Sequence, residues 1–254
     1  KKCRLITMLI NPFMSCSARL PVYLLLIGTF FPNNAASVLI GLYILGTVVA
    51  IITARILRRV FYSKDDTPFV MELPPYRIPT MYAVIKHMWE KCAQYLKKIG
   101  TVILLSTIVI WALSYYPKND DLTVAEQSEQ SYIGKIGKSI EPVMEPLGLD
   151  WRASIAIVTS IPAKELVVSS MGVLYDRENE EGLQEAIIKS GNYTPASSLA
   201  FMVFILLFFP CIATIVAVIN ETGNKWWGVF TIVYNTAVAW VVAYIVYQIA
   251  LLVI

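Results

Sequence analysis

The stretch NPFMSCSARLP, residues 11–21, interrupts an apolar part of the chain with two prolines, a cysteine and an arginine. Proline inside an α-helix removes a backbone donor and clashes with the preceding turn, at a cost of about 3 kcal/mol. We therefore predict that the helix breaks here. At membrane depth, such a break is tolerated where it is buried in protein or borders a watery cavity.

The sequence around this stretch has the composition of a membrane protein. Of its 254 residues, 57% are hydrophobic and 15% are charged, whereas soluble domains carry roughly 25% charged residues. A helix needs about 20 apolar residues to cross a bilayer, and apolar runs occupy residues 20–31, 36–57, 99–116, 151–175, 196–219 and 226–254. The predicted fold is all-α: a polytopic transmembrane helical bundle with broken or re-entrant helices.

The distribution of Lys and Arg predicts the orientation of the bundle. The connection 55–98 is rich in both and is expected on the cytoplasmic face, whereas the acidic connection 117–150 fits the opposite face. Simple alternation of spans then returns the C-terminus to the cytoplasm. Residues 79–98 place apolar side chains at three- and four-residue steps, which predicts an amphipathic surface helix after a proline-containing linker at 71–79.

A second interruption, TSIPAKEL at residues 159–166, places Pro162, Lys164 and Glu165 between two short apolar halves. An ionised group at the bilayer centre costs on the order of 3 kcal/mol, so both charges are expected to face the protein interior. Two roles remain open for Glu165, an ion pair with Arg19 and a place in a permeation path. Whether 151–175 spans the membrane or re-enters it is also open.

A third interruption, FFPCIAT at residues 208–214, resembles the first. Phe13, Cys16 and Ala18 have the same spacing as Phe208, Cys211 and Ala213. Paired interrupted helices indicate a transport site between structural repeats. A cysteine thiolate is a soft ligand for late first-row metals, although a lone membrane cysteine is more often a small buried hydrophobe.

These interruptions supply the candidate site residues. The candidates for the metal or transport path are Cys16, Cys211, Glu165, Ser15, Met14, Asn11, Ser160 and Thr214. The candidates for structural or gating roles are Pro12, Pro162, Pro210, Lys164 and Arg19.

No catalytic or nucleotide-binding residue is expected in the chain. The run GKIGKS at 134–139 ends like a phosphate-binding loop, but the glycine which that motif requires at position 132 is Tyr132. We expect a short amphipathic helix there instead. The net charge of +3 gives no reason to expect nucleic acid as a partner.

Four motifs identify a family resemblance. FMSCSARLPVY (13–23), MELPPYRIP (71–79), AKELVVS (163–169) and PCIAT (210–214) closely resemble the membrane domain of FeoB, the bacterial ferrous iron transport protein B. The resemblance implies gate-type repeats that move Fe²⁺ inward across the bacterial inner (cytoplasmic) membrane. It places the family's intramembrane cysteines at Cys16 and Cys211, and its Ala-Lys-Glu motif at 163–165.

The resemblance also implies a domain division and a set of partners. Residues 1–62 would be the end of a first gate region and the following transmembrane helix, 63–98 the cytoplasmic linker and surface helix, and 99–254 a second gate-type region with an extracytoplasmic loop at 117–150. The chain looks like the C-terminal portion of a longer transporter whose GTP-binding domain precedes it. Fe²⁺ is expected as transported substrate, without a permanently bound cofactor. The expected partners are the lipid bilayer, that GTP-binding domain, a small cytoplasmic accessory protein and further copies of the chain.

Two other functions stay open. A gate-fold carrier of nucleosides or another small solute would have an aromatic and amide-lined cavity and would be indifferent to Cys16→Ser. A membrane anchor or sensor would transport nothing. Within the transport hypothesis, a divalent metal other than Fe²⁺ and a channel rather than a carrier also remain open.

Overall fold

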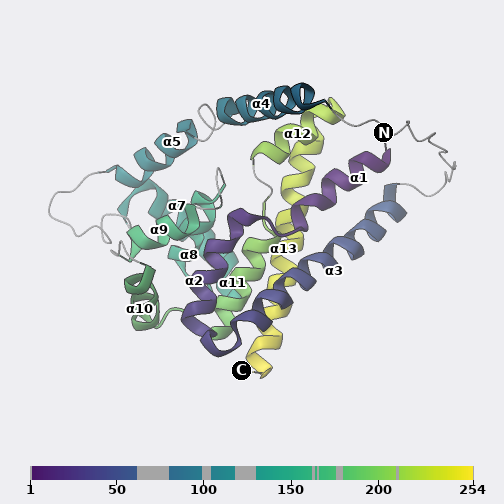
Figure 1. Cartoon of the computed structure of the whole chain (residues 1–254). Helices are drawn as coiled ribbons and strands as arrows, with labels where there is room; N and C mark the ends of the chain where they lie inside the picture. Colours follow the sequence, from purple (N-terminus) through teal and green to yellow (C-terminus); the bar gives the residue numbers. More distant parts are fainter. Residues whose placement is uncertain are drawn as a thin grey trace.

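The computed structural model describes residues 2–61, 80–98, 104–117, 130–161, 164, 166–175, 180–209 and 212–253, and these residues form helices and turns without a strand. The helices are α1 (Lys2–Ile10), α2 (Leu20–Phe30), α3 (Ala35–Phe61), α4 (Met81–Lys98), α5 (Leu104–Tyr115), α7 (Tyr132–Met144), α8 (Trp151–Thr159), α9 (Leu166–Leu174), α10 (Glu180–Ser190), α11 (Pro195–Leu207), α12 (Ile212–Thr222) and α13 (Lys225–Val253) (Figure 1). Short 3₁₀ turns occupy Asn11–Phe13, Ser17–Arg19, Pro32–Asn34 and Glu145–Leu147.

Three stretches among the described residues are long and apolar enough to cross a membrane: Leu5–Phe30, Pro32–Val60 and Lys225–Leu252. With 27 residues in α3 and 29 in α13, each of these helices exceeds the roughly 30 Å of a hydrocarbon core. Both also expose large apolar side chains, such as Ile52 and Ile245. The prediction of an all-α membrane bundle is confirmed.

Two broken helix pairs run side by side in opposite directions (Figure 1). The pair α1–α2 descends in the view of Figure 1, whereas α11–α12 ascends. Packing agrees with this arrangement, because α2 contacts α11 and α1 contacts α12. Each pair is followed by one of the two longest helices, α3 or α13. The two breaks therefore lie at a similar depth in the bundle.

The segment 151–175 turns back on itself. Its two helices, α8 and α9, have nine residues each, or about 14 Å of rise, and they pack against each other. The hydroxyl of Ser170 donates to Thr159 Oγ1 at 2.8 Å, which joins the end of α8 to the second turn of α9. This hairpin is re-entrant in form.

The fold-back corrects the predicted position of the C-terminus. In Figure 1, α13 begins at the end of the bundle where α3 finishes and runs to the opposite end, where the C-terminus lies. The expectation that the C-terminus shares the face of the basic connection is therefore wrong, because it counted 151–175 as a crossing. The correction also moves the acidic segment around α10 away from the basic face, in agreement with the positive-inside rule.

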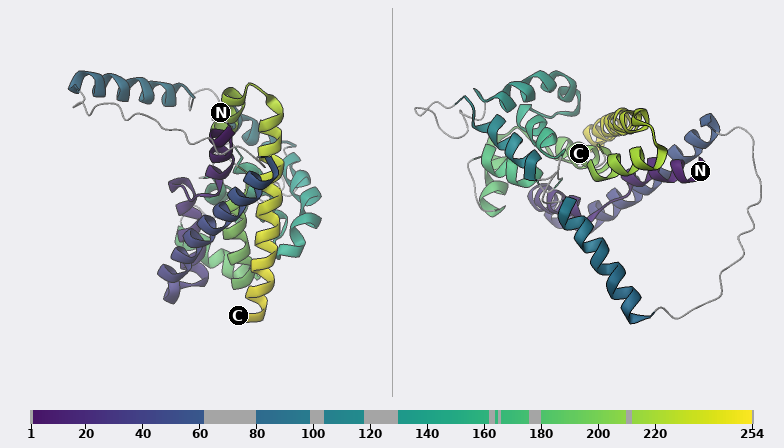
Figure 2. Two further views of the ribbon diagram at one scale, coloured as in Figure 1. Left: turned by 90° about the vertical axis from the view of Figure 1, so that its right-hand side faces the viewer. Right: turned by 90° about the horizontal axis from the view of Figure 1, so that it is seen from above.

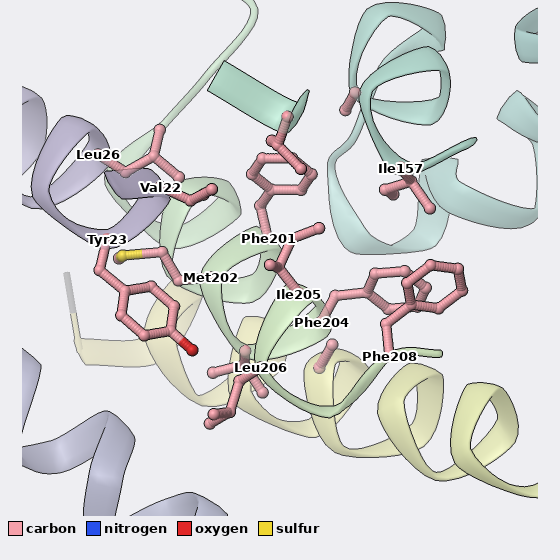
Figure 3. Packing of buried hydrophobic residues seen from close by; sticks show 14 of the residues in the cluster. Val22, Tyr23, Leu26, Ile157, Phe201, Met202, Phe204, Ile205, Leu206 and Phe208 are labelled. Carbon is pink, nitrogen blue, oxygen red and sulfur yellow. The ribbon is translucent and has the colours of Figure 1, made fainter. Parts of the chain in front are cut away.

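Helix α11 is the centre of the buried core (Figure 3). Its side chains from Ala200 to Leu207 are all buried, as expected for a helix that is apolar on every side. Figure 3 shows Phe201, Phe204 and Leu206 reaching toward neighbours on different sides of the helix. The core thus places the C-terminal end of α11 deep inside the bundle.

Helices α7 and α4 form where the sequence predicts helices. Helix α7 forms over the GKIGKS run, and Gly137 packs so closely on Ile155 that a Cβ would lie 2.6 Å from its side chain, so the predicted helix is confirmed. Helix α4 is present and lies crosswise to α13 in Figure 2. Its apolar residues Met81, Tyr82, Ile85, Met88, Trp89 and Leu96 are exposed. Contact of α4 with a membrane surface stays a prediction, and the linker 71–79 lies outside the described residues.

Candidate functional site

The first break replaces helix with two 3₁₀ turns joined by extended backbone. Pro12 opens the turn that follows α1, Met14 and Cys16 are extended with ψ of 139° and 161°, and α2 begins at Leu20. Because the backbone is extended between the two turns, carbonyls of this stretch have no helical N–H donor four residues ahead. The predicted interruption of the helix within 11–21 is confirmed.

Arg19 compensates for these missing donors. Arg19 is only 2% exposed, and its guanidinium donates from Nη1 to Met14 O at 2.8 Å and from Nη2 to Pro12 O at 2.9 Å. A planar guanidinium suits this task because it presents several donors in a fixed geometry. Arg19 thus fixes the shape of the break, and its predicted structural role agrees with these contacts.

Several buried polar atoms near the first break have no hydrogen-bond partner among the described residues. They include Ser15 Oγ, Arg19 Nε and Tyr23 OH, and also Tyr234 OH, whose ring meets the Phe13 ring at 5.8 Å. Figure 3 shows the Tyr23 hydroxyl directed toward Leu206 of α11. Since buried polar groups in proteins are nearly always paired, this region is suited to water or to a polar ligand.

Three of the four ligand candidates of the first break, Asn11, Met14 and Cys16, are exposed. Cys16 is a free, exposed thiol, Met14 is 54% exposed and Asn11 is exposed, whereas Ser15 is half-buried. The charged side chain of this break, Arg19, is buried. The first break therefore offers sulfur ligands on its accessible side and a cation on its buried side.

Lys164 plays a comparable part at the end of α11. Its ammonium donates to Ile205 O at 3.1 Å and to Phe208 O at 2.8 Å, and it lies 5.6 Å from the centre of the Phe208 ring. Helix α11 ends at Leu207, so these carbonyls lack the partners of an uninterrupted helix. The negative end of the helix dipole also favours a cation. Lys164 therefore joins the tip of the α8–α9 hairpin to α11.

The other candidates divide into placed and unplaced residues. Ser160 is buried at the end of α8 and its hydroxyl donates to Ile157 O at 2.6 Å, while Thr214 is half-buried in the first turn of α12. Four candidates lie outside the described residues: Pro162, Glu165, Pro210 and Cys211. No three His, Cys, Asp or Glu side chains gather into a metal-binding group within the described part of the chain.

The first break and the hairpin tip both reach the C-terminal end of α11. A Cβ added to Gly46 of α3 would lie 2.9 Å from Phe13 O and 3.5 Å from the Leu206 side chain. The first break, α3 and α11 therefore meet at this glycine. Lys164 brings the hairpin tip to Ile205 and Phe208 of the same helix end. The third interruption starts at Phe208, so all three interruptions meet at this end of α11.

Sequence reasoning missed two kinds of residue in this region. The carbonyls of Pro12, Met14, Ile205 and Phe208 carry no side-chain signal. Asn235 did carry one, because it places an amide in the middle of the apolar run 226–254. It is fully buried, with Nδ2 donating to Thr231 O at 2.7 Å and Oδ1 without a partner among the described residues.

A polar cluster anchors the base of the hairpin, away from its tip. The Asp150 carboxylate caps α8 through Ala153 N at 2.9 Å and accepts from Asn192 Nδ2 at 3.1 Å and from Tyr193 OH at 3.4 Å. Burial, together with the nearby Asp150 charge, raises the pKa of Tyr193 well above its usual range. These contacts fix the start of α8 to the segment that leads into α11.

Comparison with known proteins agrees with this architecture. Residues 96–225 match the Gate family model, described as nucleoside recognition, and residues 39–91 match the model of the ferrous iron transport protein B C terminus. No solved structure matches the chain. The fold and these matches define a gate-type helical membrane protein.

Three curated relatives illustrate the match. The Fe(2+) transport protein A/Fe(2+) transporter FeoB fusion protein of Porphyromonas gingivalis is 45% identical over 99% of this chain and 35% of its own length. The Fe(2+) transporters FeoB of Campylobacter jejuni and Methanocaldococcus jannaschii are each 40% identical, over 98% and 97% of this chain and over 42% and 37% of their own lengths. The chain belongs to the FeoB family. It spans 35% to 42% of the length of these relatives.

Proposed function

We propose that this chain forms part of the membrane pathway through which an intact FeoB-type protein carries Fe²⁺ into the bacterial cytoplasm. The observation that carries the proposal is the convergence of three helix interruptions at the C-terminal end of α11. In membrane transporters, interrupted helices supply carbonyl oxygens and half-helix ends for ions near mid-membrane. The relatives named above are called Fe(2+) transporters.

The chemistry of the candidates suits a ferrous ion in transit. Cys16 and Cys211 would offer sulfur, with Met14 as a weaker thioether ligand. Oxygen would come from Glu165 and from Asn11, Ser15, Ser160 and Thr214. Glu165 would lower the electrostatic barrier for a divalent ion. Few ligands of mixed type would bind weakly enough to release the ion, as a conduction path requires. Pro12, Pro162 and Pro210 would prevent continuous helix from forming across the three interruptions, so that these stay open to the path.

We also propose how the pathway is placed in the membrane and which partners act on it. The chain would be a multi-pass protein of the inner membrane, with α4 and the basic end of α3 on the cytoplasmic side. Helix α4 would receive motion from the GTP-binding domain of the intact protein, where GTP would act. The fusion to Fe(2+) transport protein A in the Porphyromonas gingivalis relative supports a small accessory partner.

Uptake of ⁵⁵Fe²⁺ by cells that express the intact protein tests the proposal. We expect Cys16→Ser, Cys211→Ser and Glu165→Gln each to lower uptake at least tenfold at equal expression. The matched control is Cys92→Ser, which removes an exposed thiol of α4. Unchanged uptake in all three site variants would remove these residues from the path and contradict the proposal.

A second candidate substrate class follows from the Gate family's description as nucleoside recognition. Stacked aromatic rings lie at the convergence, with the centroids of Phe204 and Phe208 4.9 Å apart, and such rings could hold a base. A nucleoside carrier would transport labelled uridine, and excess uridine would slow Fe²⁺ uptake. We expect neither effect.

A further inference from the structure

Lys164 occupies a position that a cation from outside the chain could take. The Ile205 and Phe208 carbonyls that hold its ammonium, at 3.1 and 2.8 Å, lie beside the face of an aromatic ring. All three groups attract positive charge. In transporters with interrupted helices, carbonyls of this kind coordinate the ion. The end of α11 is thus a cation site that one of the protein's own side chains fills.

This site lies inside the region through which the ion is proposed to pass. Phe208 opens the segment that contains Cys211, and Lys164 directly precedes Glu165 in the sequence. Only 6% of Lys164 is exposed, so water screens its charge poorly and like charges nearby repel strongly. A divalent ion and the ammonium therefore cannot share the end of α11 at low cost.

We propose that Lys164 is a tethered cation that competes with the transported divalent ion for the carbonyl end of α11. Without the ion, the ammonium holds Ile205 O and Phe208 O. When the ion binds, the ammonium withdraws and those carbonyls face the ion. This inference rests on the proposed function, because it assumes that a divalent ion reaches this end of α11.

The exchange would also move the hairpin tip. The base of the hairpin is anchored by Asp150 to Asn192 and Tyr193, and its arms are joined by Ser170 and Thr159. Lys164 holds the tip to α11. Withdrawal of the ammonium would release the tip while the base stays fixed, so ion binding would be coupled to a local movement.

Direct binding of Mn²⁺ to the purified intact protein tests the competition. The electron paramagnetic resonance signal of free hydrated Mn²⁺ reports the bound fraction for the wild type and for Lys164→Met, Lys164→Arg and Lys135→Met. We expect Lys164→Met to bind Mn²⁺ at least tenfold more tightly, because it removes the competing charge at similar length. Lys164→Arg keeps the charge, and Lys135→Met removes a charge from the exposed face of α7, so neither should gain affinity.

A purely structural role for Lys164 predicts the opposite result. Loss of the cap would disorder the end of α11, and Lys164→Met would bind Mn²⁺ equally well or more weakly, which would overturn the inference. Mn²⁺ binding is measured without transport, so a negative result here overturns only the competition at α11. Failure of the proposed function would instead appear as unchanged ⁵⁵Fe²⁺ uptake in the site variants.

A measurement on the wild type covers the case in which Lys164→Met does not fold. Reaction of Lys164 with an amine-specific reagent, followed by mass spectrometry, reports how well the ammonium is held. We expect its reactivity to rise over the Mn²⁺ concentrations that fill the site, with Lys135 unchanged. Constant reactivity of Lys164 would overturn the inference.

Discussion

Arg19 and Lys164 both donate to carbonyls that an interrupted helix leaves without donors. A helix that stops inside a bilayer leaves carbonyls without donors, and lipid supplies none. In each case a long cationic side chain is almost fully buried and donates to two of those carbonyls. These side chains therefore supply donors to carbonyls that the interruptions leave unpaired, and their charges also influence where a metal ion can bind.

Replacement of Arg19 tests the first of these caps. Arg19→Met would leave Pro12 O and Met14 O buried without donors, and we expect a loss of about 2–4 kcal/mol of stability. The stability of Arg19→Lys should lie between those of the wild type and Arg19→Met, because an ammonium cannot present two parallel donors. Thermal unfolding of the intact protein in detergent measures both.

The control for Arg19 is Arg55→Met, which removes an exposed arginine of α3. It should shift the midpoint of unfolding little. If Arg19→Met proves as stable as Arg55→Met, the guanidinium does not hold the break together.

At the scale of elements, the sequence allowed the breaks to be predicted but not the path of the chain between them. Prolines and polar residues inside apolar runs mark where a helix must stop, and the structure interrupts the helix at 11–19. The segment 151–175 has two apolar halves whether it crosses or turns back. The choice is made by contacts distant in sequence, Lys164 with α11 above all, so it could not be read from the pattern.

Helix α3 approaches the first break closely at Gly46. Gly46→Ala would bring a Cβ to 2.9 Å from Phe13 O, and backbone on both sides leaves little room to adjust. We expect a destabilisation of about 1–3 kcal/mol together with reduced Fe²⁺ uptake. Unfolding midpoints and ⁵⁵Fe²⁺ uptake of the intact protein measure the two effects.

The same helix offers a matched control. At Gly41 a Cβ would meet nothing within 4 Å, so Gly41→Ala should be neutral or stabilising by about 1 kcal/mol through helix propensity. Equal behaviour of the two alanine variants would show that α3 does not press on the break.

At the scale of the whole molecule, the two broken pairs run in opposite directions and share the centre of the bundle. One re-entrant hairpin changes the number of crossings and so decides on which side the chain ends. This is why a single wrong assumption about 151–175 misplaced the C-terminus, although most of the helices had been expected.

Cysteine labelling tests this topology. In an intact protein without its other cysteines, Cys92 on α4 should be protected from a membrane-impermeant thiol reagent added outside spheroplasts. A cysteine introduced by Leu252→Cys, at a position 88% exposed, should react. Reaction of both from the same side would restore the simple alternation and contradict the fold-back.

The central claim is that a divalent ion passes the place where the interruptions converge. The most direct test is modification of Cys16 by a thiol reagent in proteoliposomes of the intact protein carrying Cys92→Ser, with Cys16→Ser as the reference that measures how much reagent binds elsewhere. We expect modification to stop Fe²⁺ uptake, and we expect Fe²⁺ to slow the modification. Uptake that continues after Cys16 is fully modified, at a rate unaffected by Fe²⁺, would contradict the central claim.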